Sequence, residues 1–294
     1  ISVSSGYTTI YLQTGYVRNT GLELSLGYGH TWNNNFRWDS NFTLSHNKNK
    51  IKELVRDYVH PETGELINKD RLDVGGLGKA RFILKEGGTL GDLYTQSDLK
   101  RDDNGMVDID PTGIVAIENN LPDIKLGSVF PKANLAWSNH FSWKGISLSA
   151  LFTARIGGIV YSATEAAMDQ YGVSERSALA RDNGGVLVNN RTLVDAQNYY
   201  TTIGSESGLP QYYTYNATNV RLQEASIGYL IPRKWLGNVC DIQVSVIGRN
   251  LWMIYNKAPF DPESVATTDN YYQGIDYFML PSTRNIGFNV KINF

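Results

Sequence analysis

The end of the chain alternates strictly between large apolar side chains and small or polar ones. The apolar positions are Ile286, Phe288, Val290, Ile292 and Phe294. Alternation of this kind is typical of a β-strand with one apolar face and one wet face. A tilted strand of about 9–11 residues is long enough to cross a bilayer. The stretch therefore predicts either a membrane-spanning strand or a half-buried strand of a soluble sandwich.

Three earlier segments repeat the alternation as pairs of strands joined by short turns, at about 21–47, 134–156 and 219–251. In the first of these hairpins, Arg37 and Asp39 lie on the polar side of the second strand. The core of a sandwich would not accept such charges unpaired. The charged face therefore favours a water-filled barrel.

The third hairpin has one irregularity in its pattern. Its first strand fits best with Ala225, Ile227 and Tyr229 on the apolar face. Continued without interruption, that phase also places Arg221 and Gln223 on the apolar face. We therefore expect a β-bulge, or the rim of the barrel, at this point.

Long segments separate the hairpins, at about 48–133, 157–218 and 252–283. Outer-membrane barrels have short periplasmic turns and long extracellular loops, and this chain fits that topology if its last strand ends in the periplasm. The six or so strands cannot close a barrel, because the smallest barrels have eight. Either 48–133 contains further strands or the first part of the barrel precedes Ile1. We favour the second interpretation.

Composition narrows the possibilities further. The chain of 294 residues contains 18 Tyr, 10 Phe and 6 Trp, and Tyr and Trp are favoured at membrane interfaces. It has no apolar run of 18 residues, which excludes a transmembrane helix. The net charge of −2 argues against nucleic acid as a partner. Cys240 is the one cysteine, so neither an intrachain disulfide nor a cysteine metal cluster can form.

Four stretches resemble one known family. They are NTGLEL at 19–24, VRLQEASIGYLIP at 220–232, GRNL at 248–251 with FDPE at 260–263, and the closing strand at 281–294. In this order they resemble the C-terminal barrel portion of a SusC/RagA-type TonB-dependent outer-membrane transporter from Bacteroidota. The long segments match that family only in length and loop character.

The resemblance implies an all-β fold, in which 1–294 is the C-terminal part of a large antiparallel transmembrane β-barrel with 22 strands. The plug, the TonB box and the early strands would precede Ile1. The function implied is TonB-dependent import of a glycan or peptide nutrient across the bacterial outer membrane. The implied partners are TonB, outer-membrane lipid and a SusD-like surface lipoprotein that covers the extracellular mouth.

Two alternatives remain open from the sequence. One is a siderophore-type TonB receptor or a porin, and the other is a soluble secreted β-sandwich binding module. Four residues distinguish the barrel prediction from the sandwich prediction, because their side chains would face lipid in a barrel and be buried in a sandwich. They are Phe36, Trp38, Phe42 and Leu44.

The sequence contains no recognisable catalytic motif. The stretch 204–208 has Glu206 where a nucleophile elbow requires serine. The four histidines are isolated, and the acidic stretch 100–110 has Lys100 and Pro111 where a calcium loop needs its first and last ligands. We expect no catalytic residue, no metal and no cofactor.

Tyrosines in the long segments are the candidate substrate-binding residues. Flat aromatic faces suit sugar rings and peptide side chains, and the phenol adds a polar contact. The alternative is that these rings pack loop against loop or contact the lipoprotein. The candidates are Tyr212, Tyr213, Tyr215, Tyr271, Tyr272 and Tyr277.

Overall fold

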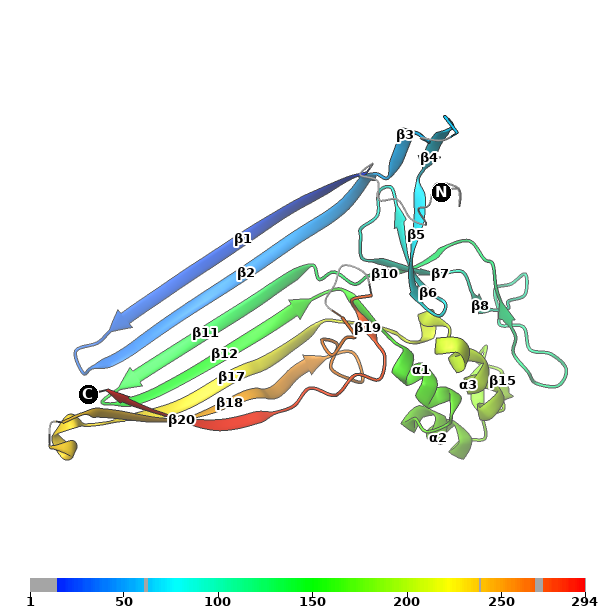
Figure 1. Cartoon of the computed structure of the whole chain (residues 1–294). Coiled ribbons are helices and arrows are strands. Elements are labelled where there is room, and N and C mark those ends of the chain that lie inside the picture. Colours follow the sequence, from blue (N-terminus) through cyan, green and yellow to red (C-terminus); the bar gives the residue numbers. More distant parts are fainter. Residues whose placement is uncertain (1–14, 61–62, 238, 268–271, 294) are drawn as a thin grey trace, which may run out of the picture.

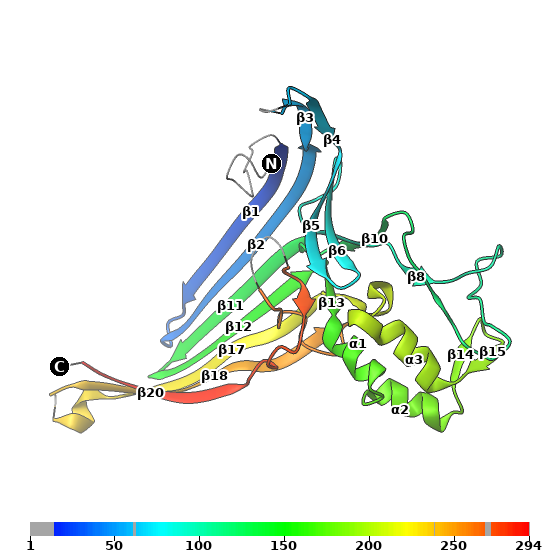
Figure 2. The same cartoon turned by 45° about the vertical axis from the view of Figure 1, so that its right-hand side comes forward.

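The computed structural model describes residues 15–60, 63–237, 239–267 and 272–293. Within these ranges, seven long antiparallel strands form one sheet, which we call the wall (Figures 1 and 2). In order across the sheet, the strands are β1 (Tyr16–Thr31), β2 (Phe36–Glu53), β11 (Ala133–Trp143), β12 (Ile146–Ile156), β17 (Asn219–Ile231), β18 (Asp241–Asn256) and β20 (Asn285–Asn293). These are the strands that alternation predicts, so the three hairpins and the C-terminal strand are confirmed.

The register of the wall collects the apolar residues on one face. Leu44 of β2 lies opposite Leu24 of β1 and Leu135 of β11, and the same matching continues to Phe288 opposite Val246. Many of these side chains are exposed, among them Leu22, Leu26, Ile227 and Phe288. The four residues that separate a barrel from a sandwich lie on this face and are partly exposed, not buried. The structure therefore favours a barrel wall over a sandwich.

Two polar residues interrupt the apolar face, and neighbouring indoles satisfy both. Ser40 lies directly opposite Asn139. Trp137 Nε1–H donates to Ser40 Oγ at 3.0 Å, and Trp38 Nε1–H donates to Asn139 Oδ1 at 3.1 Å. This reciprocal arrangement allows polar groups to face an apolar medium without the cost of unpaired hydrogen-bonding groups.

The expected bulge lies at Gln223. On the neighbouring strands, Leu151 is opposite Glu224 while Phe152 is opposite Leu222, so Gln223 is the extra residue. The bulge places Arg221 on the polar face, opposite Thr153. The uninterrupted phase was therefore wrong for Arg221, because a bulge reverses the face of every residue that precedes it.

The short turns lie at one end of the wall and the long connections at the other (Figure 1). The first long connection does contain further strands, but they pair with one another and not with the wall. They are β3 (Val55–Val59), β4 (Leu66–Lys69), β5 (Arg71–Leu77), β6 (Ala80–Lys85), β7 (Asp92–Thr95), β8 (Asp98–Leu99), β9 (Ile117–Glu118) and β10 (Ile124–Ser128). The first long connection therefore adds no strand to the described part of the wall.

The second long connection contains short helices that alternation did not predict. Ser162, Ser174 and Asp195 cap α1, α2 and α3, each accepting a hydrogen bond from a backbone N–H three residues on. Its elements are β13 (Ile159–Ser162), α1 (Ala163–Gln170), α2 (Glu175–Asp182), β14 (Val186–Val188), β15 (Thr192–Val194), α3 (Ala196–Gly204), η2 (Ser205–Ser207), η3 (Pro210–Tyr212) and β16 (Thr214–Asn216). Two short elements lie elsewhere: η4 (Arg233–Leu236) in the turn between β17 and β18, and β19 (Ile275–Asp276) in the third long connection. No helix in the described ranges is long and apolar enough to span a membrane.

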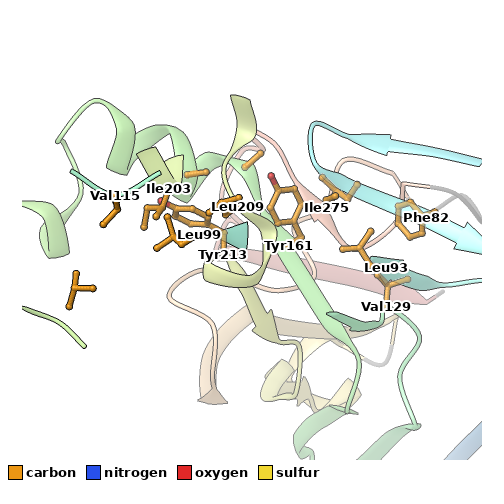
Figure 3. Close-up of a cluster of buried hydrophobic side chains, with 14 of the residues drawn as sticks. Phe82, Leu93, Leu99, Val115, Val129, Tyr161, Ile203, Leu209, Tyr213 and Ile275 are labelled. Atoms are coloured by element: carbon orange, nitrogen blue, oxygen red, sulfur yellow. The ribbon is translucent and has the colours of Figure 1, made fainter. Parts of the chain in front are cut away.

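The main apolar core lies among the long connections, which together we call the loop body, and not in the wall. β13 pairs with β16 on one side and with β19 on the other, which brings the second and third connections together. Around these strands, side chains from all three connections are buried together (Figure 3). A smaller cluster contains Ile51 of β2 with Leu54 and Leu84. The loop body is therefore packed onto the end of the wall.

Candidate substrate-binding site

The polar face of the wall is hollowed just below the loop body. A cavity of about 700 Å³ extends across β1, β2, β11, β12 and β17 and also touches the third connection. Its charged residues are Glu23, Arg155 and Glu263, and serine, threonine, asparagine and glutamine side chains contribute much of the rest. Such a lining suits a solute that forms many hydrogen bonds.

A buried ionic cluster, here called the clamp, joins the wall to the third connection beside this cavity. Arg221 donates two hydrogen bonds to the Asp261 carboxylate, at 3.1 and 2.8 Å, and lies 3.4 Å from Glu263. Asn219 Nδ2 also donates to Glu263, at 3.2 Å. Only 6% of the Arg221 side chain and 10% of the Asp261 side chain is exposed. The Asp-Pro-Glu stretch therefore anchors the loop, and its glutamate reaches the cavity.

Two opposing effects act on the pKa of Asp261. Burial raises it, but the hydrogen bonds from Arg221 and from the backbone N–H of Glu263 lower it by more. The pKa of Asp261 therefore lies below its ordinary value, and the carboxylate stays charged at neutral pH. The clamp is an ion pair under physiological conditions.

Further charges on the polar face are paired with one another. Arg37 donates to Asp39 at 2.6 and 2.8 Å, and Arg249 donates to Glu224 at 2.8 Å. A second hollow, of about 310 Å³, is lined in part by Asp39, His140 and Glu224. The polar face thus presents charges along the wall, as the interior of a water-filled barrel would.

Three of the candidate tyrosines lie within the loop body. Tyr213 is fully buried (Figure 3), and its hydroxyl donates a hydrogen bond to Asp169 at 2.9 Å, a contact outside that view. Burial raises the pKa of the Tyr213 phenol, and the Asp169 carboxylate raises it further. Tyr212 packs against the same core, and Tyr215 stacks edge-on against Phe260 with ring centroids 5.7 Å apart. Their placement agrees with the alternative, in which these rings pack loop against loop.

The other candidate tyrosines are more open. Tyr272 is 43% exposed beside Phe82, and Tyr277 is 51% exposed beside Phe278. Tyr271 lies outside the described residues. The five candidate tyrosines that the structure describes do not lie in one site, but Tyr272 and Tyr277 are accessible to a ligand.

The acidic stretch 100–110 uses its carboxylates within the loop. Asp108 pairs with Lys100 at 2.7 Å, and Asp102 Oδ1 accepts from the backbone N–H groups of Asn104 and Met106. Asp110 Oδ1 likewise accepts from Thr112 and from a backbone N–H further along. Among the described residues, no group of three or more histidine, cysteine, aspartate or glutamate side chains could hold a metal ion.

The structure shows a buried hydrogen-bond network beneath Tyr213 that the sequence did not predict. Asp169 accepts hydrogen bonds from Ser174 at 2.5 Å and from Arg176 at 2.9 Å. The Arg176 guanidinium also lies 4.8 Å from the centre of the Tyr213 ring. The sequence does carry one usable signal, because Ser162 precedes Glu165 by three residues, as in a capping box. That signal locates the start of α1 but not the partners of Asp169.

The closing-strand residues lie on the apolar face at one edge of the wall. Ile286 and Phe288 are 74% and 79% exposed, and Val290 and Ile292 are each 49% exposed. β20 pairs with β18 on one side. Phe294 lies outside the described residues. That this strand closes a barrel against a further strand stays a prediction.

An antiparallel wall with one apolar face, one charged and hollowed face, short turns at one end and a large loop body at the other is the arrangement expected of a portion of a transmembrane β-barrel. No protein-family model matches the chain. The chain is similar to two TonB-dependent receptors of Formosa agariphila, P3 and P26. It is 25% identical to P3 over 98% of its own length and 24% identical to P26 over its whole length. It spans only 30% and 31% of these relatives.

Solved structures give the same result for the fold. The whole chain superposes on 31% of a chain in the RagAB peptide transporter, with a TM-score of 0.66 and 18% identity. The RagAB peptide importer in its closed-closed and open-open states gives TM-scores of 0.64 and 0.61. The comparisons therefore agree with the resemblance seen in the sequence: over its whole length the chain is similar to TonB-dependent receptors, and it has the fold of part of the RagAB transporter.

Proposed function

We propose that the chain forms part of the barrel wall of a TonB-dependent importer in the bacterial outer membrane. The observation that carries this proposal is the division of the wall into an exposed apolar face and a polar, charged face. An apolar face that no described segment covers suits lipid, and the opposite face suits a water-filled passage. The names of the similar receptors support TonB as the source of energy.

The proposed substrate is a small glycan or peptide. The cavity below the loop body offers carboxylates, a guanidinium and neutral hydrogen-bonding groups, which match the amides of peptides and the hydroxyls of sugars. Tyr272 and Tyr277 would supply exposed aromatic faces above it. The peptide transporter among the similar structures supports the peptide alternative.

The proposed partners are TonB and a SusD-like surface lipoprotein. The chain spans about 30% of its relatives, so the plug and TonB box belong, on this proposal, to a part of the protein outside 1–294. The lipoprotein would cover the mouth on the side of the loop body. Substrate would be held beneath it until TonB moves the plug. Because transport moves the substrate without changing its covalent bonds, we expect no enzymatic activity.

Uptake in cells tests the proposal. Cells that lack this gene should lose uptake of labelled glycans or peptides, and uptake should also stop when TonB is removed. Tyr272→Ala and Tyr277→Ala should each weaken uptake, because each removes an exposed ring. Tyr171→Ala is the matched control, since Tyr171 is 77% exposed but lies at the end of α1. Uptake that continues without TonB would instead indicate a porin.

A further inference from the structure

Positive side chains gather on the apolar side of the wall, just beyond the apolar residues, where β1 and β2 reach the loop body. Arg18 lies on β1, and Lys48, Lys50 and Lys52 lie on β2. All four are exposed, and together we call them the basic row. The last large apolar residue before the row on β1 is Leu22.

The register determines which way the row points. Leu22 lies opposite His46, and Arg18 lies opposite Lys50, so the row continues the face that carries the apolar residues. The alternate residues point the other way: Val17 and Ile51 pack into the small cluster beneath the loop body. Because side chains alternate along a strand, Arg18, Lys48 and Lys50 point outward, away from the loops.

Asn49 provides an independent check on this orientation. It lies between Lys48 and Lys50 on β2, and its Oδ1 accepts a hydrogen bond from the backbone N–H of Leu90 at 2.9 Å. The Asn49 amide also donates to Asn19 of β1 at 2.9 Å. Since Asn49 is tied to the loop body, both lysines beside it must face the opposite side.

The row is electrostatically unbalanced. Arg18 and Lys50 are direct cross-strand partners, and like charges in that relation are destabilising. Lys48 flanks them about 7 Å away along the strand, and Lys52 lies in the register shift beyond Ile51. Within the part of the chain that the structure describes, none of the four forms an ion pair, whereas Arg37, Arg71 and Arg221 do. An anion bound on the row would relieve this repulsion.

The depth of the row matches the polar region of a bilayer. Arg18 lies four residues beyond Leu22, which is about 13 Å along the strand and about 10 Å in height at the tilt of a barrel strand. The headgroup layer extends roughly 5–8 Å beyond the hydrocarbon on each side. Lys48, closer to the apolar band, therefore lies within that layer, and the backbone of Arg18 and Lys50 lies about 2 Å or more beyond it, a distance that their long side chains span.

We propose that the basic row binds the phosphate groups of a lipid A-type glycolipid in the outer leaflet. The proposal rests on the proposed function, which places this face of the wall in the outer membrane. A guanidinium binds phosphate through paired hydrogen bonds, and ammonium groups add charge around it.

Binding to nanodiscs tests the proposal on the mature protein. The discs contain phosphatidylcholine alone, or with lipid A, or with dephosphorylated lipid A, and lipid bound to the protein is quantified by mass spectrometry. Arg18→Gln/Lys50→Gln removes two basic residues, each of which contributes roughly 1 kcal/mol at a membrane surface. Because affinity changes about tenfold per 1.4 kcal/mol, the double variant should bind lipid A more weakly by on the order of 30-fold. Raising the salt concentration should weaken binding by the wild-type protein.

Lys144→Gln/Lys234→Gln is the matched control, because it removes the same charge from exposed residues in the short turns at the opposite end. It should leave lipid A binding unchanged. Equal binding by the double variant of the row, or equal binding of dephosphorylated lipid A, would overturn the inference. So would inorganic phosphate that displaces lipid A at equal concentration, since the site would then be one for free phosphate.

These outcomes separate the inference from the proposed function. A protein that inserts into every disc but shows no preference for lipid A contradicts only the basic row. A protein that inserts into none contradicts both, because the apolar face would then not be a lipid-facing surface.

Discussion

Replacing Arg221 by leucine removes the cation of the clamp and leaves the Asp261 carboxylate buried beside an apolar side chain. The pair is 6% and 10% exposed, so water cannot replace the lost hydrogen bonds. Removing one partner of a buried ion pair typically costs about 3–5 kcal/mol. We therefore expect Arg221→Leu to lower the free energy of unfolding by about that amount and to free the third connection from the wall.

Urea unfolding in detergent micelles, followed by tryptophan fluorescence, measures the loss, and limited proteolysis of 257–267 measures release of the loop. The Arg37–Asp39 pair is a control on the same face of the wall, since its side chains are 57% and 35% exposed. Arg37→Leu should cost less than about 1 kcal/mol. Arg221→Leu/Asp261→Leu should recover part of the loss, because the buried Asp261 carboxylate is no longer left without its cation, and Glu263 is 40% exposed to water.

The pH dependence provides a further check on the same residue. The pKa of Asp261 is lowered in the folded state, so its contribution to stability is fully present above the unfolded value of about 3.9. That contribution should be lost as the pH falls from there through the lower folded pKa. The Arg221→Leu variant should lack most of this loss. A cost below about 1 kcal/mol, or costs that simply add in the double variant, would refute the reasoning.

Three other predictions concern separate features of the wall and loops. Val246→Arg on the apolar face should cost about 2–4 kcal/mol in a refolding assay in lipid, whereas Ser245→Arg on the polar face should cost little; equal costs would contradict the assignment of faces. Asn139→Ala should cost about 1–3 kcal/mol in the same assay, because the Trp38 indole loses its acceptor; an unchanged stability would show that lipid headgroups or water replace it. Tyr272→Ala should weaken substrate binding roughly 5- to 10-fold, measured by calorimetry, since stacking of an aromatic ring contributes about 1 kcal/mol; unchanged binding would remove this residue from the site.

The wall could be predicted from the sequence because the signals that specify its strands are local in the chain. Each strand needs only its own period of two, and neighbouring strands joined by short turns must pair. Even the bulge at Gln223 left a trace, because the apolar phase broke there. The direction of Arg221 could not be read in advance, since it depends on whether the extra residue lies before or after that position.

The loop body was largely beyond sequence reasoning. Its helices are eight or nine residues long, too short for a clear 3.6-residue period, and they are held by caps and by distant partners. Tyr213 illustrates the limit: its neighbours in sequence suggest an exposed aromatic run, but Asp169, 44 residues earlier, binds its hydroxyl in the core. Such non-local pairing has no signature in a single sequence.

The central claim is that one face of the wall meets lipid and the other meets water. Single cysteines along β18 test it most directly, in a Cys240→Ser background that removes the one thiol within 1–294. In outer-membrane vesicles, cysteines at Gln243 and Ser245 should react with a water-soluble maleimide, and cysteines at Val244 and Val246 should not. Equal labelling at all four positions, or labelling in the opposite alternation, would contradict the account.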